Sequence, residues 1–168
     1  DYYVSSNNFS VYRLIESWPN WEGKWVNIYG PKGSGKTHLS NILKKKINSI
    51  NIIDAKNINN ETISKFEKLD CLVIDNYEKN IDENLFYSLL NHLKQLNGFI
   101  VINTEFPIKN MKFELKDLKS RVESFLSVGI ELPTDDLLRV IISKYFSDKQ
   151  IDLNPKFSEY IIKNIDRS

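Results

Sequence analysis

The sequence lacks most of the features that would place it in a special class of protein. It contains a single cysteine, Cys71, so an internal disulfide is excluded. The 23 basic and 22 acidic residues leave a net charge of +1, which predicts no wholesale electrostatic binding to nucleic acid or anionic membranes. No apolar run approaches the ~20 residues that a membrane-spanning helix needs, and no secretory signal is recognisable. These absences favour a soluble globular protein of the cytoplasm without a membrane partner.

The chain is also short, and it begins at Asp1 without an initiator methionine. We therefore expect it to be an excerpt of a longer protein. Its 168 residues suffice for one domain and the start of a second.

One run, Gly30–Thr37 (GPKGSGKT), stands out because it matches the P-loop pattern G-x-x-x-x-G-K-[ST]. Such a loop binds phosphate through successive backbone N–H groups and the positive end of the following helix. We expect Lys36 to reach the β- and γ-phosphates and Thr37 to bind Mg²⁺. The predicted ligands are therefore ADP or ATP with Mg²⁺. The predicted contacts are Gly30, Pro31, Lys32, Gly33, Ser34, Gly35, Lys36, Thr37 and His38.

Strand and helix patterns alternate along the chain, which is typical of an α/β sandwich with a parallel sheet. We predict a five-stranded parallel sheet in a nucleotide-binding domain at residues 1–133, followed by the start of a small helical lid at 134–168. All three tryptophans lie between positions 18 and 25, where only Lys24 is basic. Packing on the core is therefore favoured over a nucleic-acid stacking platform. The predicted strands are 25–29, 50–54, 71–75, 99–102 and 128–132, and the predicted helices are 10–16, 37–47, 60–69, 82–96 and 115–125, with two more starting at Thr134 and Asn154.

An acidic residue, Asp75, ends the buried strand 71–75, 39 positions after Lys36. A Walker B carboxylate belongs at such a position, where it would bind Mg²⁺ together with Thr37. The next residue is Asn76, and an amide can orient water but cannot accept its proton. We therefore expect good nucleotide binding and slow hydrolysis. The loop residue Glu78 is an alternative acid, although exposure to solvent is its simpler interpretation.

Polar residues Asn103 and Thr104 end the next strand, where either side chain could contact the γ-phosphate or a water molecule. The alternative is a simple turn, since asparagine favours turns. Because the carboxyl ends of parallel strands share one edge of a sheet, we expect Asn103, Asp75 and the P-loop to converge.

Three stretches together resemble the DnaA-related AAA+ ATPases: Gly35–Leu39 (GKTHL), Ile74–Glu78 (IDNYE) and Leu118–Arg121 (LKSR). The Asp75–Asn76 pair is most similar to the Hda group, the regulatory inactivators of DnaA, because DnaA proteins typically carry two acids there. The segments Tyr3–Asn8 and Trp18–Trp21 are similar to alphaproteobacterial members.

The resemblance implies a regulator of the initiation of bacterial chromosome replication. Arg121 would be an arginine finger offered in trans to the ATP of DnaA, and would stimulate its hydrolysis together with the DNA-loaded sliding clamp. We expect the clamp to be bound through a tail outside these residues. Asn103 or Thr104 would match sensor 1, Arg167 would match the sensor 2 arginine of the lid, and Val4 would lie near the adenine. The implied catalytic candidates are thus Arg121, Asn76, Asn103 and Thr104.

Other interpretations remain open. The main alternative is the ATPase domain of a DnaA-type initiator or helicase loader with its own hydrolysis. A DNA-binding initiator fragment and a small-molecule kinase are two more, but Asn76 argues against an initiator, and a kinase would need a lid with several arginines. Contacts between AAA+ subunits are head-to-tail, so the chain would assemble with itself or with DnaA, without sequence-specific DNA binding.

Overall fold

The computed structural model describes residues 9–130 and 142–143. Strands and helices alternate as the sequence predicts. Along the chain the elements are α1 (Phe9–Ser17), β1 (Trp25–Tyr29), α2 (Lys36–Lys46), β2 (Ile50–Asp54), the 3-10 turn η1 (Ala55–Asn57), α3 (Asn60–Ser64), β3 (Cys71–Asp75), α4 (Glu83–Gln95), β4 (Phe99–Thr104), the 3-10 turn η2 (Ile108–Asn110), α5 (Lys116–Glu123) and β5 (Leu126–Gly129).

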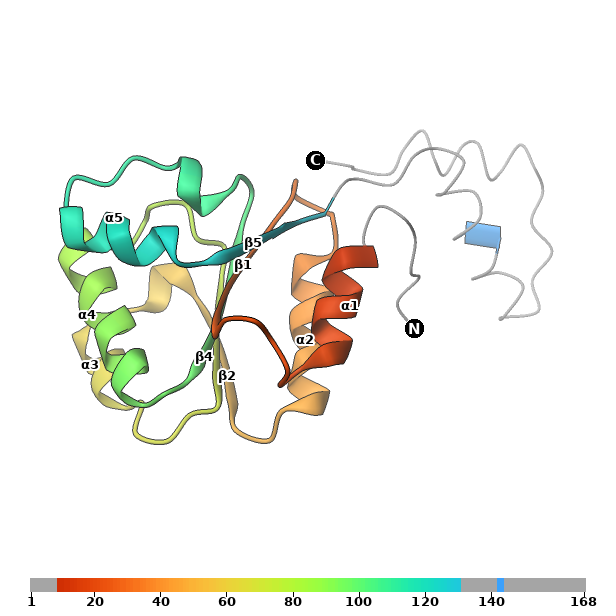
Figure 1. The fold of residues 1–168 in the computed structure, drawn as a ribbon, viewed down its shortest axis with the longest axis horizontal. Coiled ribbons are helices and arrows are strands. Elements are labelled where there is room, and N and C mark those ends of the chain that lie inside the picture. Colours follow the sequence, from red (N-terminus) through yellow and green to blue (C-terminus); the bar gives the residue numbers. More distant parts are fainter. Residues whose placement is uncertain (1–8, 131–141, 144–168) are drawn as a thin grey trace.

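The five strands form one parallel sheet in the order β2-β3-β4-β1-β5, which confirms the predicted sheet. Helices α1 and α2 cover one face, and α3, α4 and α5 cover the other (Figure 1). Strand β1, which leads into the P-loop, lies between β4 and β5. The residues that follow β1, β3 and β4 therefore emerge at the same edge of the sheet, where ligands of open α/β sheets bind.

Alternating side chains on the strands supply two hydrophobic cores, because successive residues of a strand point to opposite faces. On one face Val26, Ile28 and Val73 pack with residues of α1 and α2. On the other face Leu72 and Ile74 pack with residues of α4 and α5. All five of these side chains are buried, which explains the continuous apolar runs in the sequence.

Two predicted elements differ from the structure. The helix predicted to Leu69 ends at Ser64, because the N–H groups of Lys65 and Phe66 bond three residues back and tighten the last turn. The fifth strand, predicted at 128–132, is Leu126–Gly129, and it therefore begins two residues earlier than predicted. Its position is set by pairing with β1, in which Gly129 lies opposite the ring of Tyr29.

The tryptophans pack on the core as predicted. Trp18 and Trp21 meet the ring of Phe99 edge-on, at centroid distances of 5.7 and 5.4 Å. Trp25 lies 5.4 Å from the ring of Phe125. The rings of Trp18 and Trp21 thus attach the segment at and after the end of α1 to the first residue of β4.

The predicted lid helices and the boundary at residue 133 fall outside the described residues, so the division into two domains stays a prediction. Among residues 9–130 and 142–143, none of the helices has the length and apolar character that crossing a bilayer requires.

Candidate nucleotide-binding site

The loop between β1 and α2 has the backbone geometry of a phosphate cradle. Gly33 and Gly35 have φ values of 80° and 98°, a region that side-chain-bearing residues rarely adopt. Gly30 has no room for a side chain, since a Cβ there would lie 2.7 Å from the carbonyl oxygen of Ile130. Helix α2 begins with no side-chain hydrogen bond at its cap. No capping side chain therefore occupies its first N–H groups, which leaves them available to an anion.

The ammonium group of Lys36 lies inside this loop. It donates hydrogen bonds to the carbonyl oxygens of Gly30 and Pro31, the latter at 3.0 Å, and lies 3.5 Å from Ser34 Oγ. Burial lowers the pKa of Lys36, while the nearby charge of Asp75 acts in the opposite direction. A phosphate bound in the loop would meet a partly desolvated cation, whose attraction is stronger than in water.

The proposed magnesium ligands are brought together across the sheet edge. Thr37 Oγ1 donates a hydrogen bond of 3.1 Å to Asp75 Oδ2. A hydroxyl and a carboxylate are hard oxygen ligands of the kind that Mg²⁺ takes, together with phosphate oxygens. The residues present therefore fit a Mg²⁺–nucleotide complex.

Asn103 connects the carboxylate to the P-loop helix. Its Nδ2 donates to Ser40 Oγ at 2.9 Å and lies 3.3 Å from Asp75 Oδ1. The Ser40 hydroxyl in turn donates to the backbone carbonyl of Lys36 at 3.2 Å. Asn103 is fully buried, and its Oδ1 has no hydrogen-bond partner within the described part of the chain. The convergence of Asn103 with Asp75 and the P-loop, expected from the strand ends, is present.

The side chain of Thr104 lies in a different environment from that of Asn103. Its hydroxyl accepts a hydrogen bond from Asn27 Nδ2 at 2.9 Å and donates to the Phe106 carbonyl at 2.6 Å. Asn27 also bonds the Ile102 carbonyl and the Ile108 N–H. The Thr104 hydroxyl is therefore committed within the fold, and Asn103 is the better candidate for contact with a ligand.

Asn76 is exposed beside Asp75, with a left-handed φ of 56°. Its Nδ2 donates a hydrogen bond of 2.8 Å to Asp54 Oδ2, at the end of β2. Sequence reasoning missed Asp54, although it ends an apolar strand just as Asp75 does. It also missed Asn27 and Ser40, for which the sequence contains no comparable signal.

Arg121 is not part of this edge. It lines a surface hollow with Lys24, Trp25 and Gly98, which lie at the starts of β1 and β4. The P-loop follows the other end of β1, and a five-residue strand separates its ends by about 13 Å. Within the described residues no hydrogen bond or ion pair engages the guanidinium group of Arg121. Arg121 thus lies well away from the chain's own P-loop.

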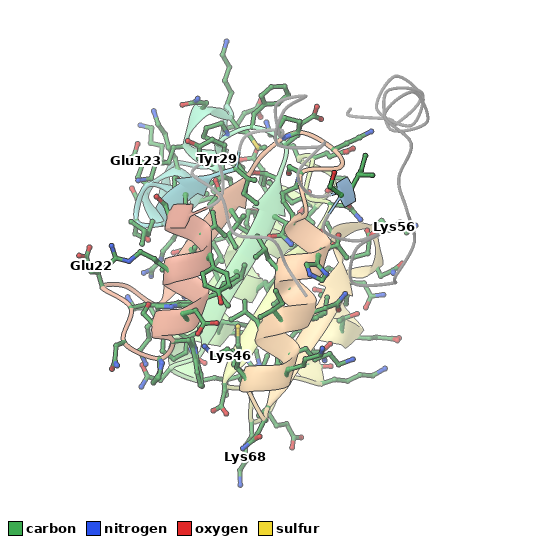
Figure 2. All side chains as sticks on the ribbon, turned by 90° about the vertical axis from the view of Figure 1, so that its right-hand side faces the viewer. Glu22, Tyr29, Lys46, Lys56, Lys68 and Glu123 are labelled. Carbon is green, nitrogen blue, oxygen red and sulfur yellow. The ribbon has the colours of Figure 1, made fainter. Side chains whose placement is uncertain are left out.

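The remaining predicted contacts lie in or beyond the loop. Lys32, in the loop, and His38, in the first turn of α2, are exposed, whereas Val4 and Arg167 fall outside the described residues. Figure 2 shows Tyr29, at the end of β1, in the upper part of the molecule and Lys68, before β3, at the bottom.

Comparison with known proteins agrees with this geometry. A family model described as RNA helicase matches residues 26–118. The chain belongs to this family. The part of the chain that matches the RNA helicase family extends from β1 into α5, and it contains the P-loop, Asp75 and Asn103.

Relatives within the curated proteins carry the name chromosomal replication initiator protein DnaA. The protein of Buchnera aphidicola is 32% identical over 161 residues, which are 82% of this chain and 35% of the relative. That of Treponema denticola is 29% identical and is matched over 95% of this chain and 39% of its own length. The chain thus spans little more than a third of the length of these relatives.

Solved structures of DnaA have the same fold. The AMPPCP-bound DnaA of Aquifex aeolicus superimposes with a TM-score of 0.75 at 22% identity, over 99% of this chain and 59% of that one. Domain III of the Thermotoga maritima protein gives a TM-score of 0.75 at 21% identity, over 97% and 78%. The predicted AAA+ sandwich is confirmed, because the chain has the fold of the AAA+ domain in these DnaA structures.

Proposed function

We propose that this chain is the nucleotide-binding module of a DnaA-like replication-initiation protein, and that it binds Mg²⁺–ATP or ADP through Gly30–Thr37. The observation that carries the proposal is the contact of Thr37 with Asp75 at 3.1 Å, beside a loop that already contains the Lys36 ammonium. The AMPPCP-bound DnaA of Aquifex aeolicus, which has the same fold, supports a nucleoside triphosphate as ligand.

Each group would have a separate task in binding. The loop N–H groups and Lys36 would hold the phosphates, and Thr37 and Asp75 would hold the cation. Bound Mg²⁺ would neutralise charge on the phosphates. Asn103 would present its buried, unpartnered carbonyl oxygen to the same region. Because Asn76 cannot act as a base, turnover by the module alone would be slow.

Titration of the full-length protein with a fluorescent ATP analogue, and then with ADP, tests this proposal. Binding at micromolar concentration that requires Mg²⁺ for the triphosphate is expected. If neither nucleotide binds at millimolar concentration, the proposal is wrong. A separate assay of ATP hydrolysis, run without nucleic acid, with single-stranded DNA and with duplex RNA, determines whether turnover responds to nucleic acid.

A second candidate is a regulator that stimulates ATP hydrolysis by DnaA in trans, as in the Hda group. Two observations favour it: Asn76 replaces an acid, and Arg121 has no partner among the described residues and lies far from the chain's own P-loop. The regulator would contact ATP-loaded DnaA and a sliding clamp. A finger supplied in trans raises the rate by roughly 10³ to 10⁵ in well-studied NTPases.

The two candidates are separated by measuring ATP hydrolysis by DnaA with this protein and DNA-loaded clamp. The regulator requires stimulation that Arg121→Ala abolishes and that Lys119→Ala, on the same helix, retains. If the parent protein does not stimulate hydrolysis by DnaA but hydrolyses ATP itself, the first candidate, the nucleotide-binding module, is favoured.

A further inference from the structure

The side chain of Asn76 is held by a carboxylate from the neighbouring strand. Strands β2 and β3 pair in parallel so that Asp54 lies opposite Asp75, and Asn76 follows directly. Asn76 Nδ2 donates to Asp54 Oδ2 at 2.8 Å. The other oxygen, Asp54 Oδ1, accepts the backbone N–H of Lys56 at 3.0 Å, which fixes the carboxylate in place. These hydrogen bonds lower the pKa of Asp54, the bond from Asn76 most.

This contact determines which way the Asn76 amide faces. An ionised carboxylate only accepts hydrogen bonds, so the NH₂ group must point to Asp54 and the carbonyl oxygen must point elsewhere. The backbone is fixed as well, since Asn76 N–H donates to Asp75 Oδ1 at 3.0 Å. Its φ of 56° is one that asparagine tolerates better than most residues. Both the main chain and the amide of Asn76 are therefore oriented.

We propose that Asp54 is a positioning residue of the nucleotide site, which acts by orienting the Asn76 amide so that its carbonyl oxygen is offered to water. This inference rests on the proposed function. Hydrolysis adds water across the bond between the terminal phosphorus and its bridging oxygen. The released proton passes to a phosphate oxygen or to solvent, because the amide does not take it. Asp54 and Asn76 together would orient the attacking water but would not take its proton.

The pair has its carboxylate at the end of β2 and its amide directly after β3, so the residue next to Asp75 is the one that cannot act as a base. The side chains of aspartate and asparagine have nearly the same shape. Exchanging them, in Asp54→Asn/Asn76→Asp, keeps a carboxylate–amide hydrogen bond and moves the acid next to Asp75. The exchange therefore tests separately the orientation of the side chain at position 76 and the presence of an acid at that position.

Four variants of the full-length protein test the proposal, with the ATP turnover number and the nucleotide Kd measured for each. Asp54→Ala is expected to lower turnover about tenfold with Kd unchanged, since misplaced groups lose rate rather than affinity. Asn76→Ala should lose about as much, and the double variant no more than either one, because both changes remove the same unit. The variant with the exchanged pair should hydrolyse ATP at least as fast as the parent, because the hydrogen bond is kept. If the relocated acid acts as a base, its turnover number should rise about 10²-fold.

The matched control is Lys56→Ala, which removes a neighbouring charge but keeps the backbone N–H that binds Asp54. Its turnover should equal that of the parent. In Asp54→Asn the new side chain can still cap the η1 turn, so local unfolding is avoided. This variant therefore tests the orientation of the Asn76 amide alone. It should restore part of the turnover that Asp54→Ala loses.

A readout free of hydrolysis comes from the side-chain NH₂ resonances of Asn76 in ¹⁵N NMR spectra without nucleotide. They should shift in Asp54→Ala and stay unchanged in Lys56→Ala. Parental turnover in Asp54→Ala, or multiplicative losses in the double variant, would overturn the role of Asp54 alone. Failure of the parent to bind any nucleotide would overturn the proposed function and this role with it.

Discussion

Thr37 Oγ1 lies 3.1 Å from Asp75 Oδ2, although 38 positions separate the two residues in the sequence. The contact joins the first turn of α2 to the end of β3. It places the two proposed magnesium ligands beside the loop that holds Lys36. The nucleotide edge of the sheet is thus defined by contacts between elements, and the predictions below test its parts one at a time.

Removing the charge of Lys36 is expected to weaken nucleotide binding. A hydrogen bond to a charged group contributes about 1.5–3 kcal/mol, so Lys36→Ala should raise the Kd for ATP roughly 10- to 100-fold. Fluorescence titration measures the effect. Lys44→Ala, which changes an exposed lysine in the last turn of the same helix, α2, is the control and should change the Kd little. Equal losses in both variants would refute a specific role for Lys36.

Adding a methyl group at Gly30 is expected to destabilise the fold. The new Cβ would lie 2.7 Å from the Ile130 carbonyl oxygen and 2.8 Å from Ser34 Oγ. Overpacking of this kind costs about 1–3 kcal/mol of unfolding free energy, which urea denaturation of Gly30→Ala measures. The matched control is Gly23→Ala, since a Cβ there meets nothing within 4 Å. A stability of Gly30→Ala equal to that of the parent would show that Ile130 does not approach the loop so closely.

The buried amide of Asn27 is expected to hold β1, β4 and the η2 turn together. Asn27→Ala removes one hydrogen bond each from the Ile102 carbonyl, the Thr104 hydroxyl and the Ile108 N–H. Unsatisfied buried groups cost about 1–3 kcal/mol each, so a loss of about 2–4 kcal/mol is expected after relaxation. Asn51→Ala, at an exposed position of β2, should cost far less in the same denaturation experiment. Similar losses in the two variants would contradict the role given to Asn27.

The thiol of Cys71 is expected to be protected in the folded chain. Burial raises its pKa from 9.0 to about 12, so little thiolate forms at pH 8. A thiol reagent such as DTNB should react only after denaturant is added. Reaction at the rate of a free thiol in native conditions would show that β3 is not buried.

The same pKa shift predicts how stability depends on pH. Below pH 9 the thiol is protonated in both states and contributes no pH dependence. As pH rises from about 9 to about 12, the unfolded chain ionises first, so the folded state loses stability by about 1.4 kcal/mol per pH unit. The difference in unfolding free energy between the parent and Cys71→Ala isolates this contribution from other titrating groups. A constant difference across that range would contradict the burial of Cys71.

Local patterns predicted most of the fold because they report local physics. Apolar runs such as Cys71–Ile74 mark strands buried on both faces, and the P-loop glycines mark backbone that other residues rarely adopt. The predictions were wrong where distant contacts decide the ends of elements. The helix after Asn60 stops at Ser64 because Phe66 turns into the core, and β5 takes its register from Tyr29.

By itself the sequence determined the alternation of strands and helices in an α/β sheet, and it predicted a phosphate-binding loop at Gly30–Thr37 with Asp75 as the acid. Only the tertiary structure decided that Asn103 joins the site while Thr104 is committed to Asn27, and that Arg121 lies at the far end of β1. It alone placed Asp54 against Asn76. The physical reason is that hydrogen bonds between strand ends depend on strand order and register, which hydrophobic periodicity does not encode.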